Sequence, residues 1–267
     1  MSEELARVRL RGIYALAAGI ILLVGVPLVE SVSLASAGYL AAVDAVARTG
    51  NFVLLVAWIS RNAGADGAFH LFEVVPFLLA FTLPRTLSRL MWPEGARAGQ
   101  VVTLVGRVGF ACYAVALVVG VLTSKTAAAT FATATTSAQQ QAAAAGFASA
   151  FGIQNLIANV VGGLLVAVCA ALVSVRSLKS PVLPSVVGFL GMLVAAFLVV
   201  TALQFAFGLQ QVETSLSALS FAALALWLGA IGLVLIRLRA LPQQGASVRP
   251  AAPVPDPKPD AVPPARQ

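Results

Sequence analysis

His70 and Glu73 are the two ionisable residues within an apolar stretch of this sequence whose spacing suits joint chemistry. They are three residues apart and would share one face of a helix, where an imidazole and a carboxyl could bind a cation or pass a proton. Pro76 follows, and its missing N–H and its ring would kink the helix or free a carbonyl there. Glu73 is therefore the best candidate for a proton- or cation-coupled site facing an outer vestibule. The alternative, which the sequence favours, is a carboxyl that is protonated or hydrogen-bonded to Asn155 or Asn159 and only holds helices together.

Other polar residues are expected at a similar depth, toward the outer ends of their apolar stretches. A metal would need more ligands than His70 and Glu73, and Glu30 and Glu213 are the carboxylates expected nearby. We expect no metal, no cofactor and no catalytic residue. The candidate binding residues are Glu73, His70, Glu30, Asn155, Asn159 and Glu213.

The motifs of common enzyme classes are missing from the sequence. One histidine excludes a bis-histidine haem and a three-histidine zinc site within the chain. No Walker-type phosphate loop, Gly-x-Ser-x-Gly elbow, His-Glu-x-x-His or Cys-x-x-Cys occurs. A non-enzymatic role is therefore favoured.

The apolar stretches must position these residues. Hydrophobic residues make up 60% of the chain and charged residues 10%, against about 25% charged in soluble domains. Backbone groups in lipid must bond within helices or closed barrels, and the alternating pattern of a barrel is absent. The sequence predicts an all-α polytopic membrane bundle of six transmembrane helices. The runs are Gly12 to Leu34, Gly67 to Pro84, Val101 to Thr123, Phe147 to Val175, Val182 to Phe207 and Leu216 to Ile236.

The net charge of +7 is distributed by membrane side and does not indicate a nucleic-acid partner. If both termini are cytoplasmic, only Arg48, Arg61 and Lys125 lie outside, which satisfies the positive-inside rule. We expect an N-in, C-in protein of the bacterial inner membrane. The inner residues are then Arg7, Arg9, Arg11, Arg85, Arg89, Arg97, Arg107, Arg176, Lys179, Arg237, Arg239, Arg249, Lys258 and Arg266.

Two alternative topologies fit less well. A seventh span over Tyr39 to Ser60 would place Asp44 and Arg48 in hydrocarbon. A cleaved signal peptide ending at Ala35-Ser36-Ala37 would have an apolar core longer than the usual ~7–15 residues.

The chain divides into a membrane domain over residues 1–241 and a proline-rich cytoplasmic tail over residues 242–267, which we expect to be disordered. In the first outer loop, Ala35 to Asp66, the segment Phe52 to Ile59 is too short to span and is expected to pack over the bundle or lie in the interface. Ser124 to Gly146 is Ala-rich and could extend two helices as a hairpin beyond the membrane.

Stripes of small residues predict where helices pack, because helices in lipid associate through close contact and hydrogen bonds. We expect both stripes to pack within the bundle, with a homo-oligomer or membrane partner, or a ligand groove, as the alternatives. One stripe comprises Asn155, Asn159, Gly163, Ala167 and Ala171; the other comprises Ala218, Ala222, Ala225, Gly229 and Gly232.

The segment with Arg176, Ser177, Ser180, Pro181, Leu183, Pro184 and Gly188 resembles the short cytoplasmic turn of a large group of six-helix bacterial membrane proteins of unknown function. Ser185 stands where that group often has an arginine. The resemblance implies the six-helix layout and no activity. We expect a non-enzymatic membrane protein acting in an assembly or in envelope physiology. The alternatives are a small transporter using Glu73 and an intramembrane lipid-active enzyme.

Overall fold

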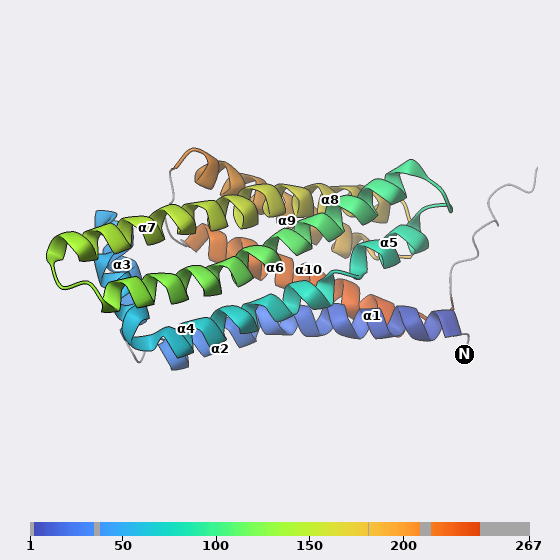
Figure 1. Ribbon diagram of the computed structural model, residues 1–267. Helices are drawn as coiled ribbons and strands as arrows, with labels where there is room; N and C mark the ends of the chain where they lie inside the picture. Colours follow the sequence, from blue (N-terminus) through green and yellow to red (C-terminus); the bar gives the residue numbers. More distant parts are fainter. Residues whose placement is uncertain (1–2, 35–37, 181, 209–214, 241–267) are drawn as a thin grey trace, which may run out of the picture.

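The computed structural model describes residues 3–34, 38–180, 182–208 and 215–240. Within them, six helices are long and apolar enough to cross a membrane, which confirms the predicted multi-pass helix bundle. The helices lie roughly side by side in one elongated bundle (Figure 1). The six spans are Glu3–Val32, Val53–Met91, Arg97–Ala132, Ser137–Ser177, Ser185–Ala206 and Leu216–Arg237.

Several spans comprise more than one helical segment. The first span joins an α-helix to π-helical turns around Pro27, which cannot donate a backbone hydrogen bond. The segments are α1 (Glu3–Ile20), η1 (Ile21–Gly25), α2 (Val26–Val29), η2 (Glu30–Leu34), α3 (Tyr39–Thr49), α4 (Val53–Ala80), α5 (Leu83–Met91), α6 (Arg97–Ala132), α7 (Ser137–Asn155), η4 (Leu156–Gly162), α8 (Gly163–Ser177), α9 (Ser185–Ala206) and α10 (Ser215–Arg237).

Small residues bring the first and last spans, α1 and α10, into close contact. A Cβ atom added to Gly19 would lie 2.5 Å from the Ala225 carbonyl oxygen, and one added to Gly232 would lie 2.6 Å from the backbone nitrogen of Leu16. The predicted stripe on α10 therefore packs against α1 of the same chain from Ala225 to Gly232. Its first residue, Ala218, is exposed.

The predicted stripe on the fourth span also faces the bundle. Asn159, Gly163 and Ala167 are buried, and Asn155 and Ala171 are half-buried. Gly109 of α6 packs against this span, because a Cβ atom there would lie 2.8 Å from the Val166 side chain. Glycines at such contacts let the helix backbones approach closely, and this supplies the packing that helices need in lipid.

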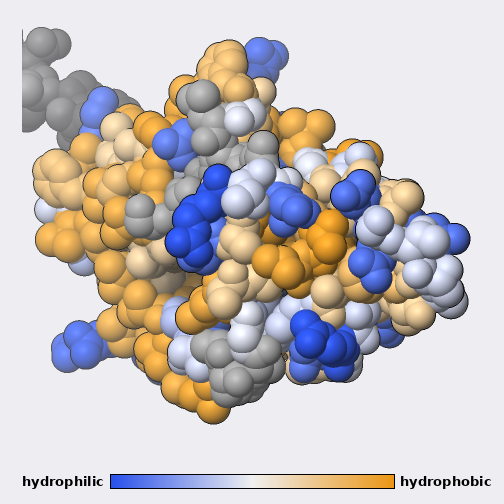
Figure 2. Space-filling model, turned by 90° about the vertical axis from the view of Figure 1, so that its left-hand side faces the viewer, coloured by the Kyte–Doolittle hydropathy of each residue, from blue (hydrophilic) through white to orange (hydrophobic). Residues whose placement is uncertain are grey.

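A second hydrophobic core lies at the end of the bundle away from the N-terminus, and we call this region the outer cap (Figure 1). It comprises α3, the first turns of α4, the end of α6 and the second half of α7. The rings of Phe147 and Phe151 stack with centroids 5.8 Å apart, and Phe52 contacts both. Figure 2 views this end of the molecule, where polar and apolar residues are interspersed. The predicted helical hairpin over Ser124 to Gly146 is thus part of a packed region.

The first outer loop is more ordered than the sequence indicates. Gly50, with φ of 67°, ends α3 and prevents one span from running through Tyr39 to Ser60. The segment Phe52 to Ile59 packs in the outer cap, as expected, but it is also the start of α4, which continues into the membrane past non-helical dihedrals at Asn62. The second helix that is long and apolar enough to span therefore starts at Val53 and not at Gly67.

Most basic residues gather at the opposite end, where α1 begins, α5 ends and α10 ends (Figure 1); we call it the basic end. The Arg9 guanidinium donates to the Leu238 carbonyl at 2.7 Å and joins the first span to the last. Arg176 donates to the Met91 carbonyl at 2.8 Å. The outer cap and its border with the bundle contain Arg48 of α3, Arg61 of α4 and Lys125 of α6.

Candidate functional site

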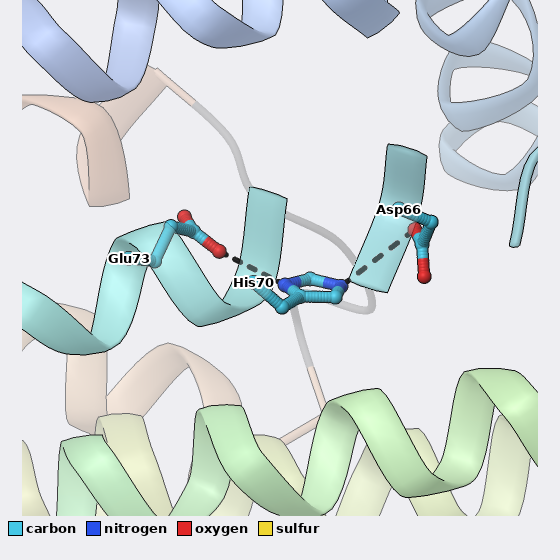
Figure 3. A network of polar contacts seen from close by, with 3 residues as sticks. All are labelled: Asp66, His70 and Glu73. Carbon is cyan, nitrogen blue, oxygen red and sulfur yellow. Dashed lines mark hydrogen bonds and ion pairs between the residues drawn. The ribbon is translucent and has the colours of Figure 1, made fainter. Parts of the chain in front are cut away.

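Three ionisable side chains follow one face of α4, and we call them the α4 network: Asp66, His70 and Glu73 (Figure 3). They are at positions i, i+4 and i+7, which fall on one stripe of a helix. The helical dihedrals persist through Pro76, so α4 continues past this proline. The break is at Asn62, one turn before the network.

The imidazole of His70 lies between the two carboxyls. Its Nδ1 is 2.9 Å from Glu73 Oε2, a hydrogen-bond distance, and its Nε2 is 3.7 Å from Asp66 Oδ1. The ring thus uses opposite nitrogens toward the two acids. Opposite nitrogens cannot chelate one ion, but they can accept a proton on one side and release one on the other. The geometry resembles a relay more than a chelate.

The network is largely removed from solvent. The Asp66 side chain is 3% exposed, and its Oδ2 is buried without a hydrogen-bond partner. His70 and Glu73 are each 18% exposed. An unpaired buried carboxyl oxygen is costly, so a proton or a cation at Asp66 would lower the free energy of this arrangement.

The network starts at the outer edge of the bundle and runs inward. Gly67 packs on Val121 of α6, two residues before the end of the predicted third apolar run at Thr123. Glu73 is seven residues after Asp66, or about 10 Å deeper along the helix axis. The three groups therefore connect the junction with the outer cap to the interior of the bundle.

Acidic groups outnumber basic ones at this site. Two carboxyls share a single imidazole, so the fully ionised network keeps one negative charge in excess. Glu30 of η2 adds a third acid, close enough to Glu73 for their charges to repel. Charge in a low-dielectric region is costly, and one proton or one monovalent cation would neutralise the excess of the α4 network itself, without Glu30. Among the described residues, no group of three or more His, Cys, Asp or Glu is arranged to hold a metal ion.

The two asparagines form a separate contact. Asn159 Nδ2 donates to Asn155 Oδ1 at 3.2 Å, across the start of η4. Glu73 bonds His70 and not these amides, so the predicted pairing of Glu73 with an asparagine is not formed. Four of the six predicted residues thus fall into two groups, with Glu30 near the first, and Glu213 lies outside the described residues.

Asp66 is the network member that the sequence-based candidate set omitted. The sequence places Asp66 in the first outer loop, because it precedes the apolar run that begins at Gly67. The signal was present in the spacing, since Asp66, His70 and Glu73 recur at four and three residues. That spacing places three ionisable groups on one helix face.

Comparison of the chain with protein-family models, curated proteins and solved structures gave no match. The geometry of the α4 network and of the basic end therefore carries the functional argument.

Proposed function

We propose that this multi-pass membrane protein takes up and passes protons through the α4 network. The observation that carries the proposal is the placement of His70 between two carboxyls within a membrane-spanning helix. Ionisable residues inside spans are costly, and rows of acids and histidines are the usual means of moving protons across hydrocarbon. A proton-linked transporter is the function that this arrangement supports best.

The proposal includes an orientation. We place the basic end in the cytoplasm of a bacterial cell, with the protein in the inner membrane, because the excess of Arg and Lys at that end follows the positive-inside rule. The outer cap and the Asp66 end of the α4 network then face the periplasm. Protons would pass between the carboxyls of Asp66 and Glu73 through the imidazole.

The test uses the fact that His70 is the single histidine of the chain. Full-length protein labelled with ¹⁵N-histidine gives one imidazole signal, whose titration with pH can be followed in detergent. The same protein in liposomes containing a trapped pH indicator reports proton flux under an imposed gradient. We expect Glu73→Gln to move the His70 titration curve and to slow flux about tenfold or more.

The matched control is Asp44→Asn, which changes an exposed acid of α3 that pairs with Arg48 on the same helix. It should leave both the His70 curve and the flux unchanged. Wild-type flux no faster than that of protein-free liposomes, or equal flux in Glu73→Gln and wild-type protein, would refute the proposal.

A non-enzymatic role in an envelope assembly is the second candidate. It is favoured by a groove of about 730 Å³ between α6 and α7 that runs from the bundle into the outer cap. Its walls are mostly alanines and threonines, with Val119, Leu122 and Phe147, and they offer little chemistry but a surface for a partner or a second copy. Absence of proton flux together with an intact fold would make this the leading function.

A further inference from the structure

A cavity of about 1080 Å³ opens at the basic end, between the start of α1, α5, the turn after α5 and the first turns of α6. Five arginines from three helices line it: Arg7, Arg11, Arg85, Arg89 and Arg107. The α4 network contributes nothing to this cavity. Its function therefore requires a separate explanation.

Helix spacing aims these arginines into the same space. Arg7 and Arg11 are four residues apart on α1, and Arg85 and Arg89 are four apart on α5, so each pair follows one helix face. Arg11 Nη1 donates to Thr86 Oγ1 at 3.2 Å, which holds α1 against α5. The positive charges of the other four arginines all act on Arg11.

The cavity wall carries more positive than negative charge. The acids that line it are Glu3, Glu4 and Glu94. Glu3 already pairs with Arg7 at the exposed rim, where both side chains are mostly accessible. Five arginines against three acids leave an excess of two positive charges. Repulsion among guanidinium groups that converge in this way is relieved by an anion between them.

Arg107 is the deepest of the five. It lies six residues into the apolar run that begins at Val101, or about 9 Å along the helix. Its guanidinium sits over the Phe81 ring at 5.0 Å, and its Nε is buried without a hydrogen-bond partner. A guanidinium at this depth is costly unless an anion or water accompanies it.

The cavity also borders the lipid-facing surface. Leu104 lines it and is 65% exposed, on the side of α6 that the bundle leaves uncovered. Trp92, an amphipathic ring of the kind found at membrane interfaces, lines it as well. A molecule with an anionic head and apolar chains would match both walls.

We propose that this cavity binds a phosphate-bearing anion, and that its source is the headgroup of an anionic phospholipid. The planar fork of a guanidinium matches two phosphate oxygens, so several arginines can share one phosphodiester. The acyl chains would leave past Leu104 into the bilayer. This assignment is independent of proton transfer at the α4 network.

The experiment measures binding of a short-chain phosphatidylglycerol to the full-length protein in an uncharged detergent, by the rise in thermal unfolding temperature with lipid concentration. Phosphatidylcholine of the same chain length should raise it far less, because its headgroup has no net charge. We expect Arg11→Lys and Arg89→Lys to weaken phosphatidylglycerol binding about tenfold, because lysine keeps the charge but loses the two-point contact.

Arg97→Lys is the matched control, because Arg97 is at the same end but does not line the cavity. It should bind phosphatidylglycerol as the wild type does. A second variant, Arg89→Gln, tests the charge itself, and its unfolding temperature without lipid shows whether it is folded.

Equal binding of phosphatidylglycerol and phosphatidylcholine, or wild-type affinity in folded Arg89→Gln, would overturn the proposal. Competition by inorganic phosphate separates the two parts of the proposal. If phosphate displaces phosphatidylglycerol at equal concentration, the cavity binds phosphate, but a phospholipid headgroup is not its specific ligand. If it does not compete, both parts of the proposal hold.

Discussion

Charge is used differently in the α4 network and in the basic cavity. The α4 network is built on a single helix, and its acids find their partner, His70, three and four residues away. The basic cavity is built between helices, and five arginines from α1, α5 and α6 face one another with few acids. One region leaves a single negative charge in excess and the other leaves positive charge in excess. This difference suggests a proton for the first region and an external anion for the second.

The two regions also depend on the bundle in different ways. Local helix geometry fixes the order Asp66, His70, Glu73 as long as α4 remains helical. The basic cavity exists only while α5 and α6 stay in contact. A change at a helix–helix contact should therefore destroy the cavity and spare the network.

Gly106→Val should have the largest effect. A Cβ atom at Gly106 would lie 2.5 Å from Pro84 Cγ and 2.8 Å from Cys169 Sγ. Pro84 precedes Arg85 and Gly106 precedes Arg107, so the contact holds two arginines on facing walls. We expect a loss of about 3 kcal/mol in the free energy of unfolding and a loss of phosphatidylglycerol binding. Thermal unfolding in detergent and the lipid titration measure these effects.

Gly146→Ala is the corresponding control, because a Cβ atom there meets nothing within 4 Å. It should stabilise α7 by about 0.5 kcal/mol through its higher helix propensity. If Gly106→Val abolished the His70 titration as well as lipid binding, the two regions would not be separable.

Asp66→Leu should have a smaller effect of opposite sign. The variant replaces a buried carboxyl that has an unpartnered oxygen with an apolar side chain of similar size. We expect the free energy of unfolding to rise by about 1 kcal/mol, while proton flux is lost. Thermal unfolding and the liposome assay provide both readouts. A loss of stability would indicate instead that the Asp66 carboxyl has a partner that holds α4 in place.

The sequence predicts the bundle well because lipid imposes a simple rule on it. Long apolar runs must become helices, and glycine stripes such as the one ending at Gly232 mark close helix contacts. The outer cap is harder to predict, because its parts lie outside these runs and pack through contacts distant in sequence. Phe52 meets Phe147 and Phe151, which no local pattern indicates.

The sequence predicts only part of the candidate site, because it identifies candidates by their place in an apolar run. His70 and Glu73 lie inside such a run, whereas Asp66 lies one residue before the run that begins at Gly67. Helix periodicity ignores that boundary and continues outward to Asn62. The membrane side assigned to the basic residues does not indicate a cavity either, because Arg11, Arg89 and Arg107 line one space only in the folded bundle.

The smallest effect should come from Asp44 and Arg48, an exposed ion pair on α3. Water and salt screen such a pair, so a double-mutant cycle with Asp44→Asn and Arg48→Gln should give a coupling energy below about 0.5 kcal/mol. Thermal unfolding of the two single variants and the double variant measures it. This pair also joins a carboxylate to a basic group on one helix, but its side chains are 71% and 56% exposed. A coupling energy well above this value would mean that charges in the outer cap are as poorly solvated as those in the α4 network. The contrast between the α4 network and the basic cavity would then depend only on how their charged groups are arranged.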